Sequence, residues 1–268
     1  MFVQTVLEFA SHTDIGLVRS HNEDAIEINA EIGLAILADG MGGYNAGEVA
    51  SKMSVDLVRE QIQQKQAASW MLRLPWQSST PAKWISDAIT YANQEVIEQA
   101  NKNPDNFGMG TTIVVALSYF DRLFIGHVGD SRAYRFRDNY IEQITKDHSV
   151  LQAQIDAGLI SLADAHLSPI KNLITRAVGS HEEIDVEVHE HQMKVGDIYL
   201  LCSDGLSDML DQIHIQSVLR EQSNDLDTCS KTLVYLANRQ GGSDNISVVL
   251  IRVKELQERR FMEYIFAS

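Results

Sequence analysis

The chain has 268 residues, 44% of them hydrophobic, which is enough to bury the core of one large domain or two small ones. Its formal net charge is −15, and this excess of carboxylates disfavours nucleic acid as the main partner, because phosphate backbones are bound through a surplus of lysine and arginine. The acidic balance fits either an ordinary acidic surface or carboxylates that are clustered around metal ions.

Other features of the sequence concern the compartment. No run of about 18 apolar residues occurs, so we expect no membrane span. The N-terminal residues lack the basic start and the long apolar stretch of a signal peptide. The two cysteines, Cys202 and Cys229, form no CxxC pair, which predicts buried free thiols in a reducing compartment. We therefore expect a cytoplasmic protein.

Short runs rich in Ile, Val, Leu and Tyr recur along the chain and predict strands. In chain order they are Ala25–Asn29, Gly33–Ala38, Thr111–Ser118, Arg122–Val128, Arg132–Phe136, Ile141–Ile144, Ile198–Cys202 and Ile246–Val253. The short connection Tyr119–Asp121 indicates a hairpin between the third and fourth of these strands.

Helical periodicity appears in the segments between these strands. Apolar residues recur at helical spacing from Val49 to Leu57 and from Ile85 to Val96. Thr80 and Pro81 precede the second segment, and this pair is typical of a helix N-cap followed by proline in the first turn. A further helix is predicted over Asp227–Arg239.

The order of these elements indicates the fold class. Strands do not alternate one for one with helices, so a parallel doubly wound sheet fits poorly and an antiparallel sheet system covered by helices fits better. No internal repeat and no proline- or serine-rich linker is present, which predicts a single domain. The segment Gln61–Ala82 is the one loose stretch, and we expect it to be a docked connection.

Acidic residues flank several of the predicted strands. They are Glu23, Asp24, Asp39, Asp130, Asp204 and Asp244. Any one Asp-Gly pair at a strand end is more often a simple turn. Gathered at one edge, however, these carboxylates would repel one another unless cations neutralise them. All-oxygen ligands favour hard cations such as Mg²⁺, Mn²⁺ or Ca²⁺ over Zn²⁺.

Glycines accompany the acidic residues at two places. In Asp39-Gly40-Met41-Gly42-Gly43 they allow a sharp turn and the approach of a backbone carbonyl to an ion. The stretch Gly108–Thr112 reads as a tight entry into a buried strand, for which backbone packing is the favoured interpretation.

Arg19 is the candidate for binding a negatively charged substrate. It lies four residues before Glu23, and its planar fork matches the oxygens of a phosphate monoester. The alternative is a surface salt bridge to Glu23 or Asp24.

The chain resembles the PPM family, the type-2C metal-dependent protein phosphatases, and its DGMGG form looks like the bacterial branch. The resemblance rests on ordered segments that read TDIGLVRSHNEDA, LADGMGGYNAGEVAS, GMGTT, VGDSRAY, DHS, ITRAVGS, LLCSDGLSD and GGSDNIS. They span about Thr13 to Val253. The resemblance implies an α+β fold, a central β-sandwich of two antiparallel sheets flanked by α-helices, in one domain over residues 1–268.

The resemblance also implies roles at the centre of the site. Asp39 would bridge two metal ions, Mg²⁺ or Mn²⁺, with the Gly40 carbonyl on one of them. Asp204 and Asp244 would bind the first ion. Arg19 matches the arginine that binds the substrate phosphate.

Further residues would complete that site. Glu23 resembles the acid that reaches the second ion largely through water, and Asp24 would support it. Asp130, together with Asp204, matches a third and weaker metal position. Asn245 matches a residue beside the metal ligands, where we expect it to orient them.

Some residues depart from the family pattern. Ser149–Asn172 corresponds to the flap of bacterial members, but it ends in Ser168-Pro169-Ile170-Lys171-Asn172 where His-Pro-x-Arg-Asn is frequent. Met41 stands where many eukaryotic members carry a histidine assigned as general acid, and Tyr44 where bacterial relatives often have histidine. The identity of the proton donor stays open.

The expected activity is hydrolysis of phosphoserine and phosphothreonine in proteins by a metal-activated water. The expected partners are phosphorylated proteins, including a serine/threonine kinase and its substrates, and the expected state is a monomer. Alternatives are a metal-dependent phosphodiesterase or nuclease, for which basic patches are missing, and a degenerate phosphatase that acts as a scaffold.

Overall fold

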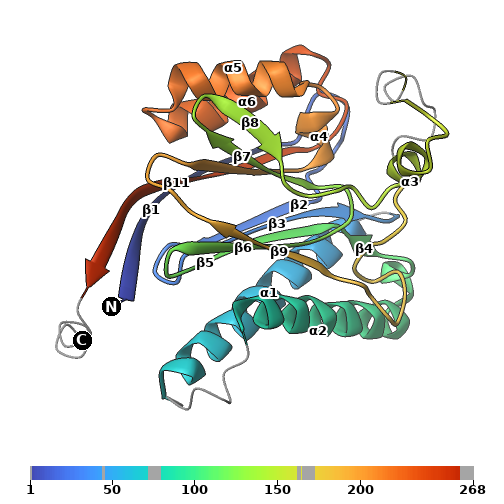
Figure 1. The fold of residues 1–268 in the computed structure, drawn as a ribbon. Coiled ribbons are helices and arrows are strands. Elements are labelled where there is room, and N and C mark those ends of the chain that lie inside the picture. The colour runs from blue at the N-terminus through green and yellow to red at the C-terminus, as the bar shows by residue number, and fades with distance from the viewer. Residues whose placement is uncertain (1, 44–45, 72–79, 162–163, 165–172, 260–268) are drawn as a thin grey trace.

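The computed structural model describes residues 2–43, 46–71, 80–161, 164 and 173–259 (Figure 1). Two antiparallel sheets stack face to face, and helices cover the outer face of each (Figure 1). This architecture confirms the α+β sandwich that the sequence predicts. Because the layers are stacked, strands far apart in the chain bring their ends together.

One sheet has five strands within the described residues, in the order β1-β11-β10-β7-β8. Their bounds are Phe2–Asp14 for β1, Ile246–Arg259 for β11, Ile198–Cys202 for β10, Arg132–Arg137 for β7 and Tyr140–Gln143 for β8. The long β1–β11 pair joins the two ends of the described chain, and the register shifts once, between Val6 and Leu7.

The other sheet has six strands in the part of the chain that the structure describes, with the order β2-β3-β5-β6-β9 and β4 paired to β3. The bounds are Asp24–Asn29 for β2, Leu34–Met41 for β3, Gly110–Thr111 for β4, Ile113–Tyr119 for β5, Arg122–Val128 for β6 and Glu187–Gln192 for β9. The predicted hairpin is β5–β6, which turns at Phe120 and Asp121.

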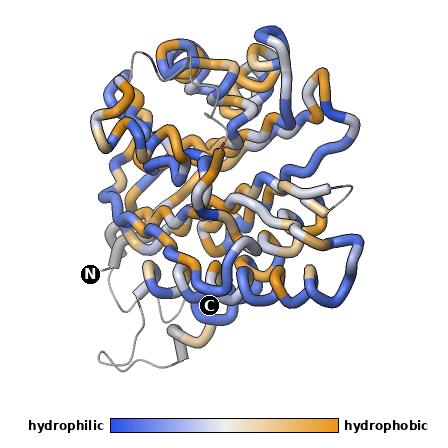
Figure 2. Tube along the Cα trace, turned by 90° about the vertical axis from the view of Figure 1, so that its right-hand side faces the viewer, coloured by the Kyte–Doolittle hydropathy of each residue, from blue (hydrophilic) through white to orange (hydrophobic). Residues whose placement is uncertain are grey.

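Helices form the outer layers. α1 (Ala46–Met71) and α2 (Pro81–Lys102) lie against the sheet that contains β3, and α5 (Gln212–Gln222) and α6 (Leu226–Arg239) lie against the other (Figure 1). Hydrophobic and hydrophilic residues are mixed along the helical coils (Figure 2), and the buried residues of α2, α5 and α6 recur at the spacing of one helix face. Shorter helices are η1 (Pro104–Asn106), α3 (Val150–Asp156) and α4 (Asp204–Ser207).

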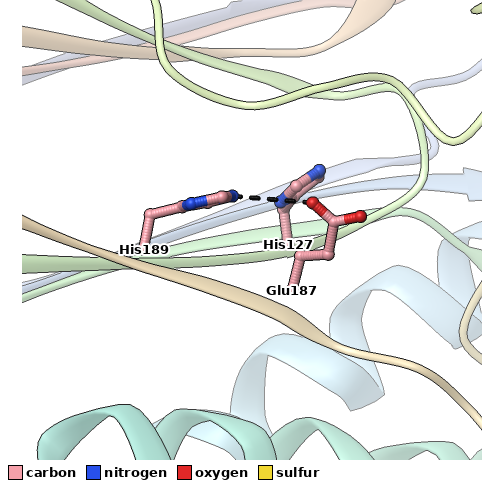
Figure 3. A group of neighbouring side chains, drawn as sticks. All are labelled: His127, Glu187 and His189. Atoms are coloured by element: carbon pink, nitrogen blue, oxygen red, sulfur yellow. Dashed lines mark ion pairs between the residues drawn. The ribbon is translucent and has the colours of Figure 1, made fainter. Parts of the chain in front are cut away.

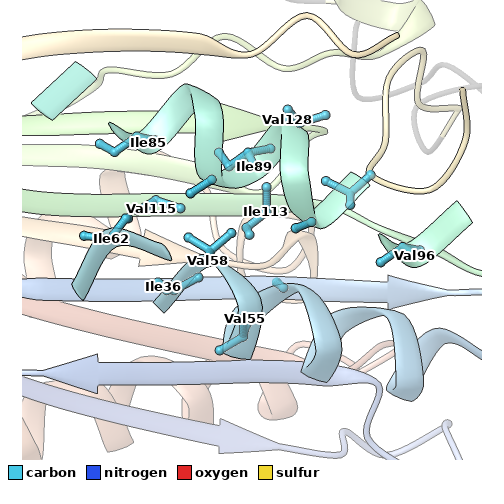
Figure 4. Close-up of a cluster of buried hydrophobic side chains, with 14 of the residues drawn as sticks. Ile36, Val55, Val58, Ile62, Ile85, Ile89, Val96, Ile113, Val115 and Val128 are labelled. Atoms are coloured by element: carbon cyan, nitrogen blue, oxygen red, sulfur yellow. The ribbon is translucent and has the colours of Figure 1, made fainter. Parts of the chain in front are cut away.

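The core consists of apolar layers between these elements. Within β3, Ile36 packs toward α1 and α2 (Figure 4), while Leu37 packs between the two sheets. Alternate residues of a strand point to opposite faces, so a strand buried on both faces reads as a continuous apolar run. This explains why Leu34–Ala38 carries no polar residue.

The structure corrects one boundary and adds elements that the sequence did not indicate to us. Gln61–Ala82 is not a loose connection up to Met71, because α1 continues that far through glutamine, lysine and alanine, which are good helix formers. β1, β9 and α5 were not predicted. In α5 the buried residues Ile215, Val218 and Leu219 had the right helical spacing.

Two further expectations can be compared with the structure. Cys202 and Cys229 are free and buried, as predicted. Among the described residues, no helix is long and apolar enough to cross a membrane.

Candidate active site

The ends of β2 and β3 place two of the predicted acids opposite each other. Asp24 pairs in register with Asp39 across these antiparallel strands. Asp39 lies inside β3 and not in the turn that the Asp-Gly pair suggested, because β4 continues the pairing to Met41. The Asp39 carbonyl accepts hydrogen bonds from the Thr112 N–H (2.9 Å) and the Thr111 hydroxyl (2.8 Å). The stretch Gly108–Thr112 therefore braces Asp39.

Strand ends from both sheets complete an acidic cluster, by which we mean Asp24, Asp39, Asp130, Asp204 and Asp244. Asp130 follows β6, Asp204 follows β10 at the start of α4, and Asp244 precedes β11. Burial raises the pKa of Asp39 well above its usual range, and the negative charges of the other four members raise it further. The predicted meeting of carboxylates at one edge is thus present.

The acidic cluster contains carboxylate oxygens that lack a partner. Burial, followed by the charge of Asp244, raises the pKa of Asp24 to about 6, although Ser203 donates a hydrogen bond to its Oδ2 at 2.9 Å. Within the described residues, Oδ1 of Asp24 and Oδ1 of Asp204 are buried and accept no hydrogen bond. Buried oxygens of like charge without donors fit a site for divalent cations.

Two further acids, Asp147 and Asp208, lie near Asp130. Burial raises the pKa of Asp130 to about 6, and the charges of Asp147 and Asp208 add to the effect against the opposing charge of Arg132. Asp208 also raises the pKa of Asp204, after burial and the charge of Asp130. The sequence does hold a signal for Asp208. It lies four residues after Asp204 at the start of a helix, and residues at that spacing share one helix face.

Glu23 lies close to two glycines, Gly40 and Gly47. The amide of Gly40 donates to the Glu23 carbonyl at 3.1 Å, and a Cβ on Gly40 would stand 2.2 Å from the Gly47 carbonyl oxygen. A Cβ on Gly47 would in turn lie 2.8 Å from the Glu23 carboxyl. Both glycines are therefore needed for the close approach of Glu23 to β3.

Asn245 fixes the loop that carries Glu23. Its Oδ1 accepts from the Glu23 amide at 2.8 Å, and its Nδ2 donates to the carbonyls of Ile15 (2.9 Å) and His21 (3.0 Å). All of these bonds hold the chain that leads into β2. This geometry is what an orienting residue beside the acids requires.

Arg19 reaches the acidic cluster. Its Nη2 donates to Oδ2 of Asp244 at 2.6 Å, and this bond raises the pKa of the guanidinium. Arg19 does form a salt bridge, but its partner is Asp244, so the alternative of a surface pair with Glu23 or Asp24 is wrong. About half of the Arg19 side chain (52%) is exposed, so its remaining donors can meet a solute.

Part of the predicted flap and one departure from the family pattern lie outside the described residues. These are residues 162–163 and 165–172 of the flap, which include its end at 168–172, and Tyr44. The described start of the flap is α3, whose first turn is capped by Ser149. The amide of Val150 donates to the carbonyl of Leu173, which closes the base of this segment.

Comparisons with known proteins agree with the sandwich and its acidic edge. A family model described as protein phosphatase 2C matches residues 11–238. The chain therefore belongs to the protein phosphatase 2C family, as its motifs suggested.

Named relatives and solved structures support the same assignment. The serine/threonine protein phosphatase PstP of Mycobacterium tuberculosis is 37% identical over 94% of this chain, which spans 46% of that protein, about half its length. The serine/threonine phosphatase stp of Listeria innocua is 34% identical, over 92% of this chain and 96% of the relative. A crystal structure of the PstP catalytic domain with two manganese ions has a TM-score of 0.81 at 36% identity, covering 95% of this chain and 100% of that one.

Proposed function

We propose that this chain is a metal-dependent phosphatase that hydrolyses phosphoserine and phosphothreonine monoesters in proteins. The observation that carries the proposal is the convergence of buried, partnerless carboxylate oxygens with an exposed arginine at the same edge. The named relatives, which are serine/threonine phosphatases, support it.

The residues that would hold the metal ions follow from the family resemblance, and the gathering of the acidic cluster supports this assignment. Asp39 would bridge two ions with the Gly40 carbonyl on one of them, and Asp204 and Asp244 would complete the first. Glu23 would reach the second through water. The bound ions would supply an acidified water and neutralise the phosphoryl oxygens.

Asp24 would support this arrangement. It lies opposite Asp39 in the β2–β3 ladder, and Ser203 donates to its Oδ2, which leaves Oδ1 for the second ion or its water. Asn245 holds the Glu23 backbone through the hydrogen bonds described above. Because these residues belong to different strands, the site depends on the stacking of both sheets.

Arg19 has two exclusive roles in this scheme. Its guanidinium forms an ion pair with Asp244, with Nη2 at 2.6 Å from Oδ2. With Asp244 committed to a cation, Arg19 would be free to place its fork on the phosphoryl oxygens of the substrate, where it would stabilise charge in the ground state and the transition state.

A third and weaker ion would lie between Asp130 and Asp204. The charge of Asp130 raises the pKa of Asp204 directly after burial does, and the charge of Asp208 raises the pKa of both, so the three carboxylates lie near one another. Asp208 is thus an added candidate ligand. Since Met41 carries no proton to donate, a water held at this position is our candidate for protonating the leaving serine or threonine oxygen.

We further propose Mg²⁺ or Mn²⁺ as the ions, two bound tightly and a third weakly. The manganese in the PstP structure supports this choice. The remaining elements of the proposal are a monomer in the cytoplasm that acts on a serine/threonine kinase and its substrates, with no role for nucleic acid or membranes.

The proposal is tested by phosphate release from a phosphoserine peptide. Activity is expected to vanish on treatment with EDTA and to return with Mn²⁺ or Mg²⁺. A phosphodiester assayed in parallel separates this function from that of a diesterase. Full activity in chelated protein, or faster turnover of the diester, would overturn the proposal.

A further inference from the structure

A second group of ionisable residues lies at the edge of the sandwich, on strands β6 and β9. His127 of β6 pairs in register with Glu187 of β9, and His189 follows two residues later on the same face. One ligand atom from each of these residues lies within 4.8 Å of the others, and the side chains converge (Figure 3). We call these three residues the histidine site.

The ring of His127 has one nitrogen ready for a ligand. Its side chain is fully buried, and Nε2 lies 2.9 Å from the carbonyl of Lys146, which can only accept, so Nε2 carries the proton. Nδ1 then presents a lone pair, and it has no hydrogen-bond partner among the described residues. Burial lowers the pKa of His127 to about 4, which keeps the ring neutral.

Neighbouring side chains hold one oxygen of Glu187, Oε1, while the other oxygen faces His189. The Gly129 amide donates to Nδ1 of His148, which places the proton of His148 on Nε2, 3.1 Å from Oε1 of Glu187. Nε2 of His148 is also 3.2 Å from Nη1 of Arg176. Arg176 also lies near Oε1, at 3.5 Å, and is shared with Asp185 at 3.1 Å. Oε2 of Glu187 points instead to Nε2 of His189, 3.5 Å away.

His189 completes the set and leaves it open to water. Its Nε2 is buried and without a hydrogen-bond partner in the described part of the chain, although 41% of the side chain is exposed. A cation bound there would therefore have three protein ligands and a position for solvent.

We propose that Nδ1 of His127, Nε2 of His189 and Oε2 of Glu187 form a binding site for a zinc-class divalent cation. Two imidazoles and one carboxylate suit Zn²⁺, whereas Mg²⁺ and Mn²⁺ prefer sites made of oxygen alone. The hydrogen bonds from His127 to a carbonyl and from His148 to Glu187 are the outer contacts that orient metal ligands and fix their tautomers.

The position of the histidine site gives such an ion a structural role. It would cross-link the edge strand β9 to β6, the strand that leads to Asp130. The His148 ring stacks on His127 with centroids 4.6 Å apart, and the next residue caps α3. The site would therefore fix the base of the flap without using any residue of the acidic cluster.

Calorimetric titration with Zn²⁺ tests this proposal, with metal-stripped protein and excess Mg²⁺ to occupy the acidic cluster. The unmodified chain is expected to bind one equivalent. His189→Gln and Glu187→Gln are each expected to weaken binding by at least about 10- to 100-fold, the range seen for loss of even an outer contact. His191→Gln is the matched control, since its ring is 6.3 Å from His189 on the same strand, and it is expected to bind normally.

Several results would overturn the proposal. The unmodified chain could fail to bind Zn²⁺ under these conditions, a test that depends on no variant. Equal affinity in His189→Gln, Glu187→Gln and the unmodified chain would place the ion elsewhere, as would an equal loss in His191→Gln. Thermal melts confirm that each variant is folded before its affinity is compared.

Discussion

The acidic cluster and the histidine site are both partly buried groups of ionisable side chains, and they are stabilised in opposite ways. In the acidic cluster like charges face one another, and burial raises the pKa of Asp39 and Asp204 well above the usual range. In the histidine site a neutral imidazole, His127, lies beside the Glu187 carboxylate, whose pKa is lowered because the hydrogen bond from His148 and the charge of Arg176 help to outweigh burial.

This difference indicates what each group would gain from a cation. The acidic cluster is under electrostatic strain that hard divalent cations would relieve. The histidine site already has most of its hydrogen bonds, and what it lacks is a partner for two ring nitrogens. The first arrangement suits ions that take part in chemistry, and the second suits an ion that holds two strands together.

The largest effect is expected from removing an acid that would bind the two tight ions directly. Asp39→Ala and Asp204→Ala should each reduce kcat for a phosphoserine peptide by more than about 100-fold, because even the loss of an outer contact costs up to that much. His189→Gln, which touches only the histidine site, should retain turnover in Mg²⁺. If Asp39→Ala stays active, the acidic cluster is not the catalytic centre.

Asp130→Asn should have a smaller and substrate-dependent effect. We expect kcat to fall about 100-fold for a phosphoserine peptide, the lower range for loss of a proton donor, and far less for an aryl phosphate, whose leaving group needs little protonation. Steady-state kinetics on both substrates give the ratio. Equal losses, or a lower melting temperature that accounts for them, would support the alternative that Asp130 only caps a turn.

Arg19→Ala should mainly raise KM, by about tenfold, if Arg19 binds phosphate equally in the ground and transition states. Arg19→Lys should restore part of the affinity, since lysine keeps the charge but loses the fork. A fall in kcat instead would show binding that is selective for the transition state. Unchanged kinetics in both variants would make Arg19 a partner of Asp244 and nothing more.

The smallest effects concern stability in EDTA. A raised pKa means that the folded state binds protons that the unfolded state releases, so stability should fall as the pH rises from about 4 to 6, through the window set by Asp24 and Asp130. Asp39→Asn removes one like charge and should raise the neutral-pH melting temperature by about 2–4 °C. Thermal melts with and without Mn²⁺ measure both, and Mn²⁺ should abolish the pH dependence. If Asp39→Asn melted at a lower temperature than the unmodified chain in EDTA, the acidic cluster would not be under electrostatic strain.

The sequence revealed these two regions unequally, for physical reasons. Asp39, Asp204 and Asp244 adjoin apolar strands and glycines, so their meeting at one edge could be predicted from residue type and position. Glu187 and His189 belong to an edge strand, EVHEHQ, whose alternation is mostly polar and gives a weak strand signal. Without β9, no pattern could place these residues beside His127, which lies some sixty positions earlier.

Pairing partners were also beyond the sequence. Arg19 was placed correctly near the acids, yet its bond to Asp244 depends on how β11 packs against the loop before β2. Asp147 and Asp208 lie in the segments DHS and LLCSDGLSD, but no pattern in the sequence assigned them a role, because neither stands directly at the end of a predicted strand. Local patterns identify ligand types, whereas the stacking of the two sheets decides which of them meet.

Diffraction data collected at the manganese absorption edge, from crystals grown with Mn²⁺, test the central claim most directly. We predict two strong anomalous peaks that share Asp39, with Asp204 and Asp244 on one of them and Arg19 detached from Asp244. An absence of anomalous density at Asp39, with the Arg19–Asp244 pair intact in crystals of active protein, would contradict the account.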